Sequence, residues 1–153
     1  MNESIMVMAQ QRTVEILLVD DNIGDVVLTK EALKGAEFSN RVSVVRDGFE
    51  ALEFLRRTGK FANASRPDLI LLDINMPRKN GCEVLEEVRC DEDLRLIPIV
   101  ILTSSEAEDD IRRAYELGAN CFVTKPADLD EMVSVVQAIN HFWITIAKLP
   151  RQL

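Results

Sequence analysis

The chain has 153 residues, with 18 Lys and Arg against 26 Asp and Glu, so its formal net charge is −8. That length favours a single domain with one well-buried core. Hydrophobic residues make up 47% of the chain, and only 6 glycines and 5 prolines are present, which excludes a disordered or fibrous protein. The acidic balance argues against a nucleic-acid-binding surface, because phosphate contacts need clustered basic residues.

Neither membrane insertion nor export is expected. No apolar run approaches the ~20 residues of a membrane-spanning helix, and residues 1–12 lack the basic start of a signal peptide. The three cysteines form no CxxC pair, so neither a zinc site nor a disulfide framework is predicted. These features favour a cytoplasmic protein.

Five short apolar runs recur along the chain, each bounded by polar or turn residues. They are Val14–Val19, Arg41–Arg46, Asp68–Asp73, Ile97–Leu102 and Cys121–Thr124. The third and fourth runs are apolar nearly throughout, as expected for strands covered on both faces of a parallel sheet. The second run alternates apolar and polar residues, which indicates an edge strand.

Segments with helical spacing of apolar residues follow each of these runs. Ser105 with Glu108, and Asp128 with Glu131, match the capping-box pattern at the starts of the last two helices. The apolar positions of the last helix continue as far as Ile146. The sequence therefore predicts five strands that alternate with five helices.

This (βα)5 order predicts an α/β fold, a doubly wound parallel sheet with helices on both faces. The strand order 2-1-3-4-5 is the common five-stranded arrangement with right-handed crossovers. We expect one domain over residues 13–140, a loose arm at residues 1–12 and an extension of the last helix at residues 141–153.

Ligands of such sheets bind outside the carboxyl ends of the strands, between the first and third strands. The residues that follow the strand ends there are Asp20, Asp21, Asp73, Thr103 and Lys125. Three carboxylates and one ammonium leave two net negative charges, and two carboxylates ~4 Å apart repel by about 4 kcal/mol at an effective dielectric near 20. Mg²⁺ would remove that repulsion. Each residue alone also has an ordinary explanation, such as a helix cap for Asp21 or a surface position for Lys125.

Several pieces of the chain resemble the receiver domain of bacterial response regulators. They are LLVDD (Leu17–Asp21), LLDINMPRKNG (Leu71–Gly81), IVILTSS (Ile99–Ser105), ELGAN (Glu116–Asn120) and FVTKP (Phe122–Pro126), in the family order. The resemblance covers about residues 13–140 and implies the flavodoxin-like receiver fold. The stretches AYELGANCF (Ala114–Phe122) and INHFWITIAKLP (Ile139–Pro150) are similar to the small stand-alone regulators paired with cyanobacterial phytochromes.

The resemblance implies that Asp73 accepts a phosphoryl group from a phosphohistidine of a sensor kinase, with a phytochrome as the implied kinase. It further implies that Asp21, Asp73 and the backbone carbonyl of Asn75 ligate Mg²⁺, while Asp20 helps through water or by orientation. An aspartate carboxylate can act as the nucleophile in such a transfer. Phosphoryl transfer needs positioning and charge neutralisation more than covalent help.

The same resemblance assigns three residues to the response that follows. Lys125 would pair with one phosphoryl oxygen, and Thr103 would hydrogen-bond another. Phe122 matches the rotating aromatic switch, and without a hydroxyl it can report only by burial or exposure of its ring. The family's Lys-Pro turn also implies a cis peptide before Pro126.

Two other classes of function stay open beside this one. A small-substrate enzyme of the same fold is disfavoured, because Asp20–Asp25 would repel an FMN phosphate and no P-loop or GxGxxG is present. In a haloacid-dehalogenase phosphatase, moreover, a second Asp would stand where this chain has Asn75. The chain is therefore not expected to be an enzyme. The other alternative is a pseudo-receiver, an interaction module that is never phosphorylated.

Only thirteen residues follow residue 140, too few to fold alone. Output should therefore pass through a protein partner, a change of oligomeric state, or transfer of the phosphoryl group to another protein. We expect a homodimer built on the last helix. Phe142 and Trp143 add apolar surface there, and Tyr115 from the preceding helix would join the contact. The alternative is that Trp143 folds back on its own domain.

Overall fold

The computed structural model describes residues 13–34 and 39–150. In this part of the chain one parallel sheet has the order β2-β1-β3-β4-β5, which confirms the predicted topology and the edge position of β2. The strands are β1 (Val14–Val19), β2 (Asn40–Val45), β3 (Leu69–Leu72), β4 (Ile99–Thr103) and β5 (Cys121–Thr124). β4 begins two residues later than predicted, because Pro98 has no N–H to give to the ladder; its carbonyl still accepts the N–H of Ile70.

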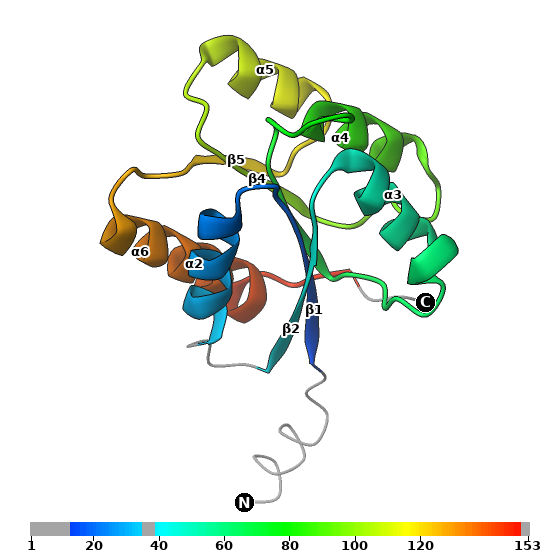
Figure 1. The fold of residues 1–153 in the computed structure, drawn as a ribbon, viewed down its shortest axis with the longest axis horizontal. Helices are drawn as coiled ribbons and strands as arrows, with labels where there is room; N and C mark the ends of the chain where they lie inside the picture. The colour runs from blue at the N-terminus through cyan, green and yellow to red at the C-terminus, as the bar shows by residue number, and fades with distance from the viewer. Residues whose placement is uncertain (1–12, 35–38, 151–153) are drawn as a thin grey trace, which may run out of the picture.

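Helices cover both faces of the sheet, as predicted (Figure 1). They are α2 (Ile23–Lys34), α3 (Gly48–Arg56), α4 (Gly81–Cys90), α5 (Glu108–Glu116) and α6 (Leu129–Asn140), with a short 3₁₀ turn at Gly59–Phe61. Helices α2 and α6 lie on one face, and α3, α4 and α5 lie on the other. The carboxyl ends of the strands therefore open between these two layers.

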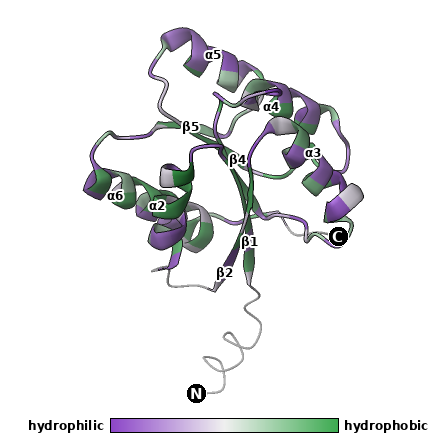
Figure 2. Ribbon diagram, in the orientation of Figure 1, coloured by the Kyte–Doolittle hydropathy of each residue, from purple (hydrophilic) through white to green (hydrophobic). Residues whose placement is uncertain are grey.

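The core is divided in two by the sheet, because successive side chains of a strand point to opposite faces. In β1, Leu17 and Val19 pack under α3, α4 and α5, whereas Ile16 and Leu18 pack under α2 and α6. Figure 2 shows hydrophobic residues along the strands at the centre of the molecule and hydrophilic residues on the outward sides of the helices. Among residues 13–34 and 39–150, none of the helices combines the length and the hydropathy of a membrane span.

The predicted helix starts are confirmed in one case and wrong in the other. The Asp128 carboxylate accepts the N–H of Glu131 at 3.0 Å and so caps α6 at the predicted residue. Only this half of the predicted capping box is formed among the described residues. The Ser105–Glu108 capping box is not formed. The hydroxyl of Ser105 donates instead to the carboxylate of Asp110 at 2.5 Å, so α5 begins after Ala107 without a side-chain cap.

The last helix changes its pitch after Asn140. A wider π-helical turn occupies His141–Ile146, and the chain becomes extended at Ala147. The predicted extension at residues 141–153 is therefore helical only in its first part; residues 151–153 and the predicted arm at 1–12 lie outside the described residues. In this wider turn Trp143 packs against the core under α2 and α6, while half of the Phe142 side chain stays exposed.

Candidate functional site

The sheet ladder extends to the residues that follow the strands. The N–H of Asp20 bonds to the carbonyl of Val45 at 3.1 Å, and the N–H of Asp73 bonds to the carbonyl of Val19 at 2.9 Å. On the far side, the N–H of Lys125 bonds to the carbonyl of Thr103 at 2.7 Å. The backbone N–H groups of Asp20, Asp73 and Lys125 are therefore held by the same kind of hydrogen bond as those of the strands.

Three of the predicted residues form an acidic cluster in this crevice. The carboxylate oxygens of Asp20, Asp21 and Asp73 offer one ligand atom each, all within 4.8 Å of one another. Asp20 and Asp73 are buried and Asp21 is exposed. The backbone N–H of Asn75 donates to Asp73 Oδ1 at 3.2 Å, which holds one oxygen of that carboxylate in place. Such a set of hard oxygen donors fits a divalent cation of the Mg²⁺ type.

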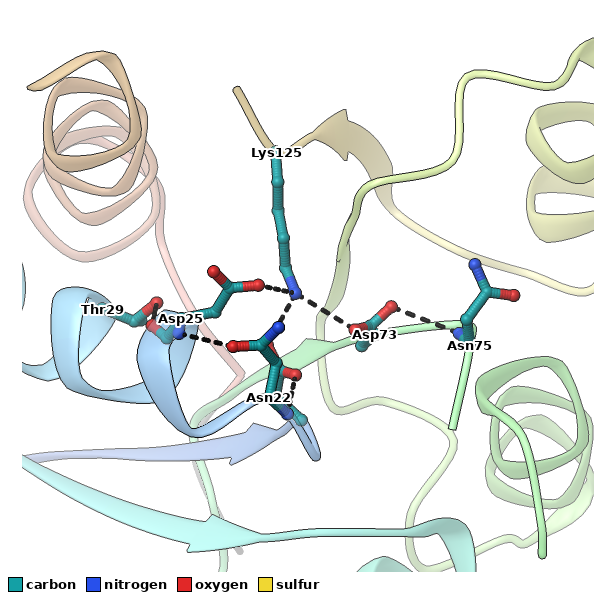
Figure 3. A network of polar contacts seen from close by, with 7 residues as sticks. Asn22, Asp25, Thr29, Asp73, Asn75 and Lys125 are labelled. Carbon is teal, nitrogen blue, oxygen red and sulfur yellow. Dashed lines mark hydrogen bonds and ion pairs between the residues drawn. The ribbon is translucent and has the colours of Figure 1, made fainter. Parts of the chain in front are cut away.

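Lys125 enters the same crevice from the end of β5 (Figure 3). Its Nζ lies 2.7 Å from Asp20 Oδ2, 2.9 Å from Asp25 Oδ2 and 3.1 Å from Asp73 Oδ2. Burial lowers the pKa of Lys125, but the hydrogen bonds to Asp20 and Asp25 outweigh it, and the net pKa is raised. The buried ammonium therefore stays charged.

At Asp20, in contrast to Lys125, burial outweighs the hydrogen bonds and determines the direction of the pKa shift. It raises the pKa of that carboxyl group above its ordinary value, even though the Lys125 ammonium and the N–H of Asn22 lower it. A second cation in the crevice would favour the charged form of the carboxylate further.

Asp25 is the residue of the site that the sequence did not predict. It belongs to the first turn of α2, where an acidic side chain ordinarily complements the helix dipole. Its contact with Lys125 brings a fourth carboxylate to the crevice, so three negative charges remain uncompensated, rather than the two expected. The available signal was that α2 begins only three residues after Asp20, which places its amino-terminal end at the crevice.

Thr103 supplies a buried hydroxyl that finds no partner in residues 13–34 and 39–150. Its side chain is fully buried, and Oγ1 makes no hydrogen bond within the described residues. Leaving a buried polar group unpaired costs about 1–3 kcal/mol, so this position favours an incoming oxygen atom. The unpaired hydroxyl fits the role of a donor to a bound oxyanion.

Phe122 on the edge strand β5 lies next to Tyr115 on α5. The ring of Phe122 is partly buried against the core under α3, α4 and α5, and its backbone N–H donates to the hydroxyl of Tyr115 at 3.1 Å. One residue before Lys125, the hydroxyl of Thr124 donates to the carbonyl of Ser105 at 3.1 Å. Strand β5 therefore connects the crevice to the surface of α5.

The remaining predicted interface residues lie on the other face of the sheet. The rings of Phe142 and Trp143 meet edge to face, with centroids 5.4 Å apart. Because α5 and α6 cover opposite faces, Tyr115 and Phe142 share no packed contact. The packing of Trp143 against its own core corresponds to the alternative considered for that residue.

The prediction of a cis peptide bond before Pro126 is wrong. All peptide bonds of the described chain are trans. A trans bond is the ordinary form before proline, favoured by about 0.5–1 kcal/mol. Lys125 reaches its three carboxylates from this trans backbone.

Comparison with known proteins agrees with this geometry. The family model of the response regulator receiver domain matches residues 16–137. The chain belongs to the receiver-domain family. The response regulator Rcp1 of Synechocystis sp. is 44% identical over 135 residues, which cover 88% of this chain and 92% of Rcp1.

Two solved structures of such regulators superpose closely on this receiver domain. The phosphorylated cyanobacterial phytochrome response regulator RcpA has a TM-score of 0.89 and 47% identity, over 92% of this chain and 100% of RcpA. The Mn²⁺-bound form of Rcp1 has a TM-score of 0.87 and 43% identity, over 90% of this chain and 99% of Rcp1. This receiver domain is thus a two-component signalling protein related to phytochrome response regulators, and its acidic cluster is suited to a divalent metal.

Proposed function

We propose that this receiver domain accepts a phosphoryl group on Asp73 from a sensor histidine kinase, in a reaction that requires Mg²⁺. The observation that carries the proposal is the convergence on one crevice of three groups. They are a carboxylate cluster, a buried ammonium 3.1 Å from Asp73, and the unpaired hydroxyl of Thr103. A module that only binds a partner needs none of these groups.

Asp73 is the nucleophile in this proposal. One carboxylate oxygen attacks the phosphorus of the kinase phosphohistidine, the P–N bond breaks, and its electron pair returns to the imidazole nitrogen. The product is an acyl phosphate. Oδ1 is held by the N–H of Asn75 and Oδ2 by Lys125, so the carboxylate is oriented before the phosphoryl group arrives, which lowers the entropic cost of the step.

The surrounding residues handle the charge of the product. Lys125 pairs with one phosphoryl oxygen, and Thr103 donates its unpaired hydroxyl to another. Mg²⁺ supplies the positive charge that offsets the carboxylates and the phosphoryl oxygens when it is bound by Asp21, Asp73 and the carbonyl of Asn75, with Asp20 assisting. In this proposal the protein is itself the acceptor of the phosphoryl group and converts no small substrate. It therefore acts as a signalling protein and not as an enzyme.

The response is proposed to leave the crevice through strand β5. The carbonyl of Thr103, at the end of β4, accepts the N–H of Lys125, the residue that follows β5. Phe122 is the switch residue on the same strand, and it adjoins Tyr115 on α5. A change at the phosphoryl group therefore has a short path to the surface around α5.

A phytochrome acting in the cytoplasm is the proposed kinase. The similarity to RcpA, a cyanobacterial phytochrome response regulator, at 47% identity supports this partner. We further propose a homodimer through the carboxyl-terminal turn, with residues 13–140 as the receiver unit and the residues after 140 as the dimerisation segment. Phe142 and Ile146 support it, because both are large apolar side chains at least half exposed.

The experiment that tests the proposal is transfer from a kinase labelled with ³²P on its histidine, with and without Mg²⁺. We expect the parent to take up label only with Mg²⁺, and Asp73→Asn to take up none, because the amide keeps the shape but is not a nucleophile. Asp93→Asn, at an exposed position, is the matched control and should behave as the parent. Label on Asp73→Asn would refute the assignment, and no label on the parent from any kinase would favour the pseudo-receiver alternative.

The choice of kinase is tested in the same assay. We expect faster transfer from a phytochrome kinase than from a histidine kinase that lacks a phytochrome sensor, at equal concentrations. Equal rates from both kinases would remove the support for the phytochrome.

A further inference from the structure

The carboxylate of Asp25 points toward Lys125 in the crevice, because neighbouring residues make the hydrogen bonds at the amino-terminal end of α2 in its place (Figure 3). An acid at the third position of a helix often turns back to the N–H of the capping residue. Here that N–H, from Asn22, donates to Asp20 Oδ1 at 2.9 Å. The side chain of Asn22 in turn accepts the N–H of Asp25 at 3.0 Å, so the Asp25 carboxylate is left for Lys125.

The backbone of Asp25 is also fixed from the inside of the helix. The fully buried hydroxyl of Thr29 donates to the Asp25 carbonyl at 2.8 Å. The position of the carboxylate therefore follows from contacts on α2, and Lys125 comes to it from β5 on the far side of the crevice.

All three N–H donors of Lys125 have carboxylate partners in this arrangement. Lys125 can therefore pair with a phosphoryl oxygen on Asp73 only if one of its N–H donors leaves the carboxylate that it now contacts. The three partners differ in exposure, because the side chain of Asp20 is 2% exposed and that of Asp73 is 7%, whereas that of Asp25 is 30%. A carboxylate that loses its partner is costly when buried and inexpensive when water reaches it.

Resting on the function proposed above, we propose that Asp25 is a positioning residue that holds Lys125 in the unphosphorylated site and gives it up to the phosphoryl oxygen. The contact between Asp25 and Lys125 then belongs to one state of the switch only. Asp25 stabilises the unphosphorylated site, so it lowers the affinity of the crevice for a phosphoryl group. Phosphorylation also releases the tie between the first turn of α2 and strand β5.

Beryllofluoride, a phosphoryl analogue that binds aspartate carboxylates, tests this at saturating Mg²⁺. We expect Asp25→Asn and Asp25→Ala to bind it about two- to fivefold more tightly than the parent, the range of a partly exposed ion pair. Glu31→Gln is the matched control, since it removes an equal charge from an exposed ion pair on the same helix. It should bind beryllofluoride as the parent does.

A second measurement on the unaltered protein separates the exchange of Lys125 from a general effect of charge. The ¹³Cγ resonance of Asp25 should move when beryllofluoride saturates the site, because its ion pair is lost. Unchanged or weaker binding by both Asp25 variants, or an Asp25 resonance that stays in place, would overturn the inference. A parent protein that does not bind beryllofluoride at all would overturn the proposed function itself, and this inference with it.

Discussion

The guanidinium of Arg89 donates to the carbonyl of Gly118 at 2.8 Å and so ties the end of α4 to the turn that leads into β5. Further donors of the same guanidinium reach the carbonyls of Arg95 and Ile97, both at 2.9 Å, and Oδ1 of Asn120 at 2.8 Å. Burial lowers the pKa of Arg89, yet the group stays charged at neutral pH. One side chain thus holds the loops that precede β4 and β5, at the amino ends of these strands and away from the crevice at their carboxyl ends.

Arg89→Ala should destabilise the fold by about 3 kcal/mol, since it leaves several carbonyl groups without their charged donor. Urea unfolding followed by circular dichroism gives this value. The control is Arg95→Ala, at an exposed position, which should stay within about 0.5 kcal/mol of the parent. Similar losses in the two variants would show that the Arg89 contacts contribute little.

Gly118→Ala should also be destabilising, by about 1–3 kcal/mol. Gly118 has φ +103°, a conformation that residues with a side chain rarely adopt, and an added Cβ would lie 2.9 Å from Cγ of Arg89. Gly24→Ala is the control, because its Cβ would meet nothing closer than 3.4 Å and φ there is ordinary. Thermal unfolding should separate the two; equal melting temperatures would contradict the prediction.

Lys125→Met should lower the melting temperature without metal and tighten Mg²⁺ binding by about tenfold, because Asp20, Asp25 and Asp73 lose the ammonium that contacts all three of them. Calorimetric titration with Mg²⁺ measures the affinity. Lys34→Met removes a lysine from an exposed ion pair on α2 and should leave the affinity unchanged. Weaker Mg²⁺ binding by Lys125→Met would show that the lysine does not oppose the metal.

Asp47→Asn should lower the melting temperature at neutral pH, with a difference that fades in acid. Burial raises the pKa of Asp47, but the N–H of Glu50 and the guanidinium of Arg78 lower it by more, so the net pKa falls below its ordinary 3.8. The charge therefore stabilises the fold above pH 3.8, and that contribution is lost as pH falls through the lower folded pKa. Asparagine still caps α3.

The measurement is thermal unfolding of both proteins from pH 7 to pH 2. Exposed Glu92 provides the control, since Glu92→Gln should follow the parent at every pH. A gap between Asp47→Asn and the parent that persists at the lowest pH would mean that the charge of Asp47 is not its cause.

Phe142→Glu and Ile146→Glu should each weaken the proposed dimer without loosening the fold, because both side chains are at least half exposed. Trp143→Ala is expected to lower the melting temperature instead, since Trp143 packs on its own core. Leu96→Glu, at an exposed leucine before β4, is the control. Sedimentation at micromolar concentration should show the parent as a dimer; a monomeric parent, or a Glu variant that dimerises equally well, would defeat the proposal.

The sheet and its order follow from the sequence because buried parallel strands are short, apolar and β-branched. The bounds of β1 and β5 agree with those predicted, and β4 differs because of the imino group of Pro98. The carboxyl ends of these strands meet by topology alone, which is why Asp20, Asp73 and Lys125 could be placed together in advance.

Other features depend on contacts that leave no pattern in the chain. Asp25 lies on a helix instead of at a strand end, so the rule for strand ends did not include it. The acceptors of Arg89 are mostly backbone carbonyls, which every residue carries. The helical spacing around Trp143 assumed a uniform pitch, and the wider turn at His141–Ile146 changes which side chains face the core.

That wider turn gives the end of the chain an adjustable orientation. An α-helix advances by roughly 100° per residue, and a π turn accommodates an additional residue within a helix. The loss or gain of one residue between 141 and 146 would therefore rotate the following side chains around the axis of α6, while the crevice keeps every group in place. The direction in which the side chains after residue 140 project can thus change without any displacement of Asp20, Asp73 or Lys125.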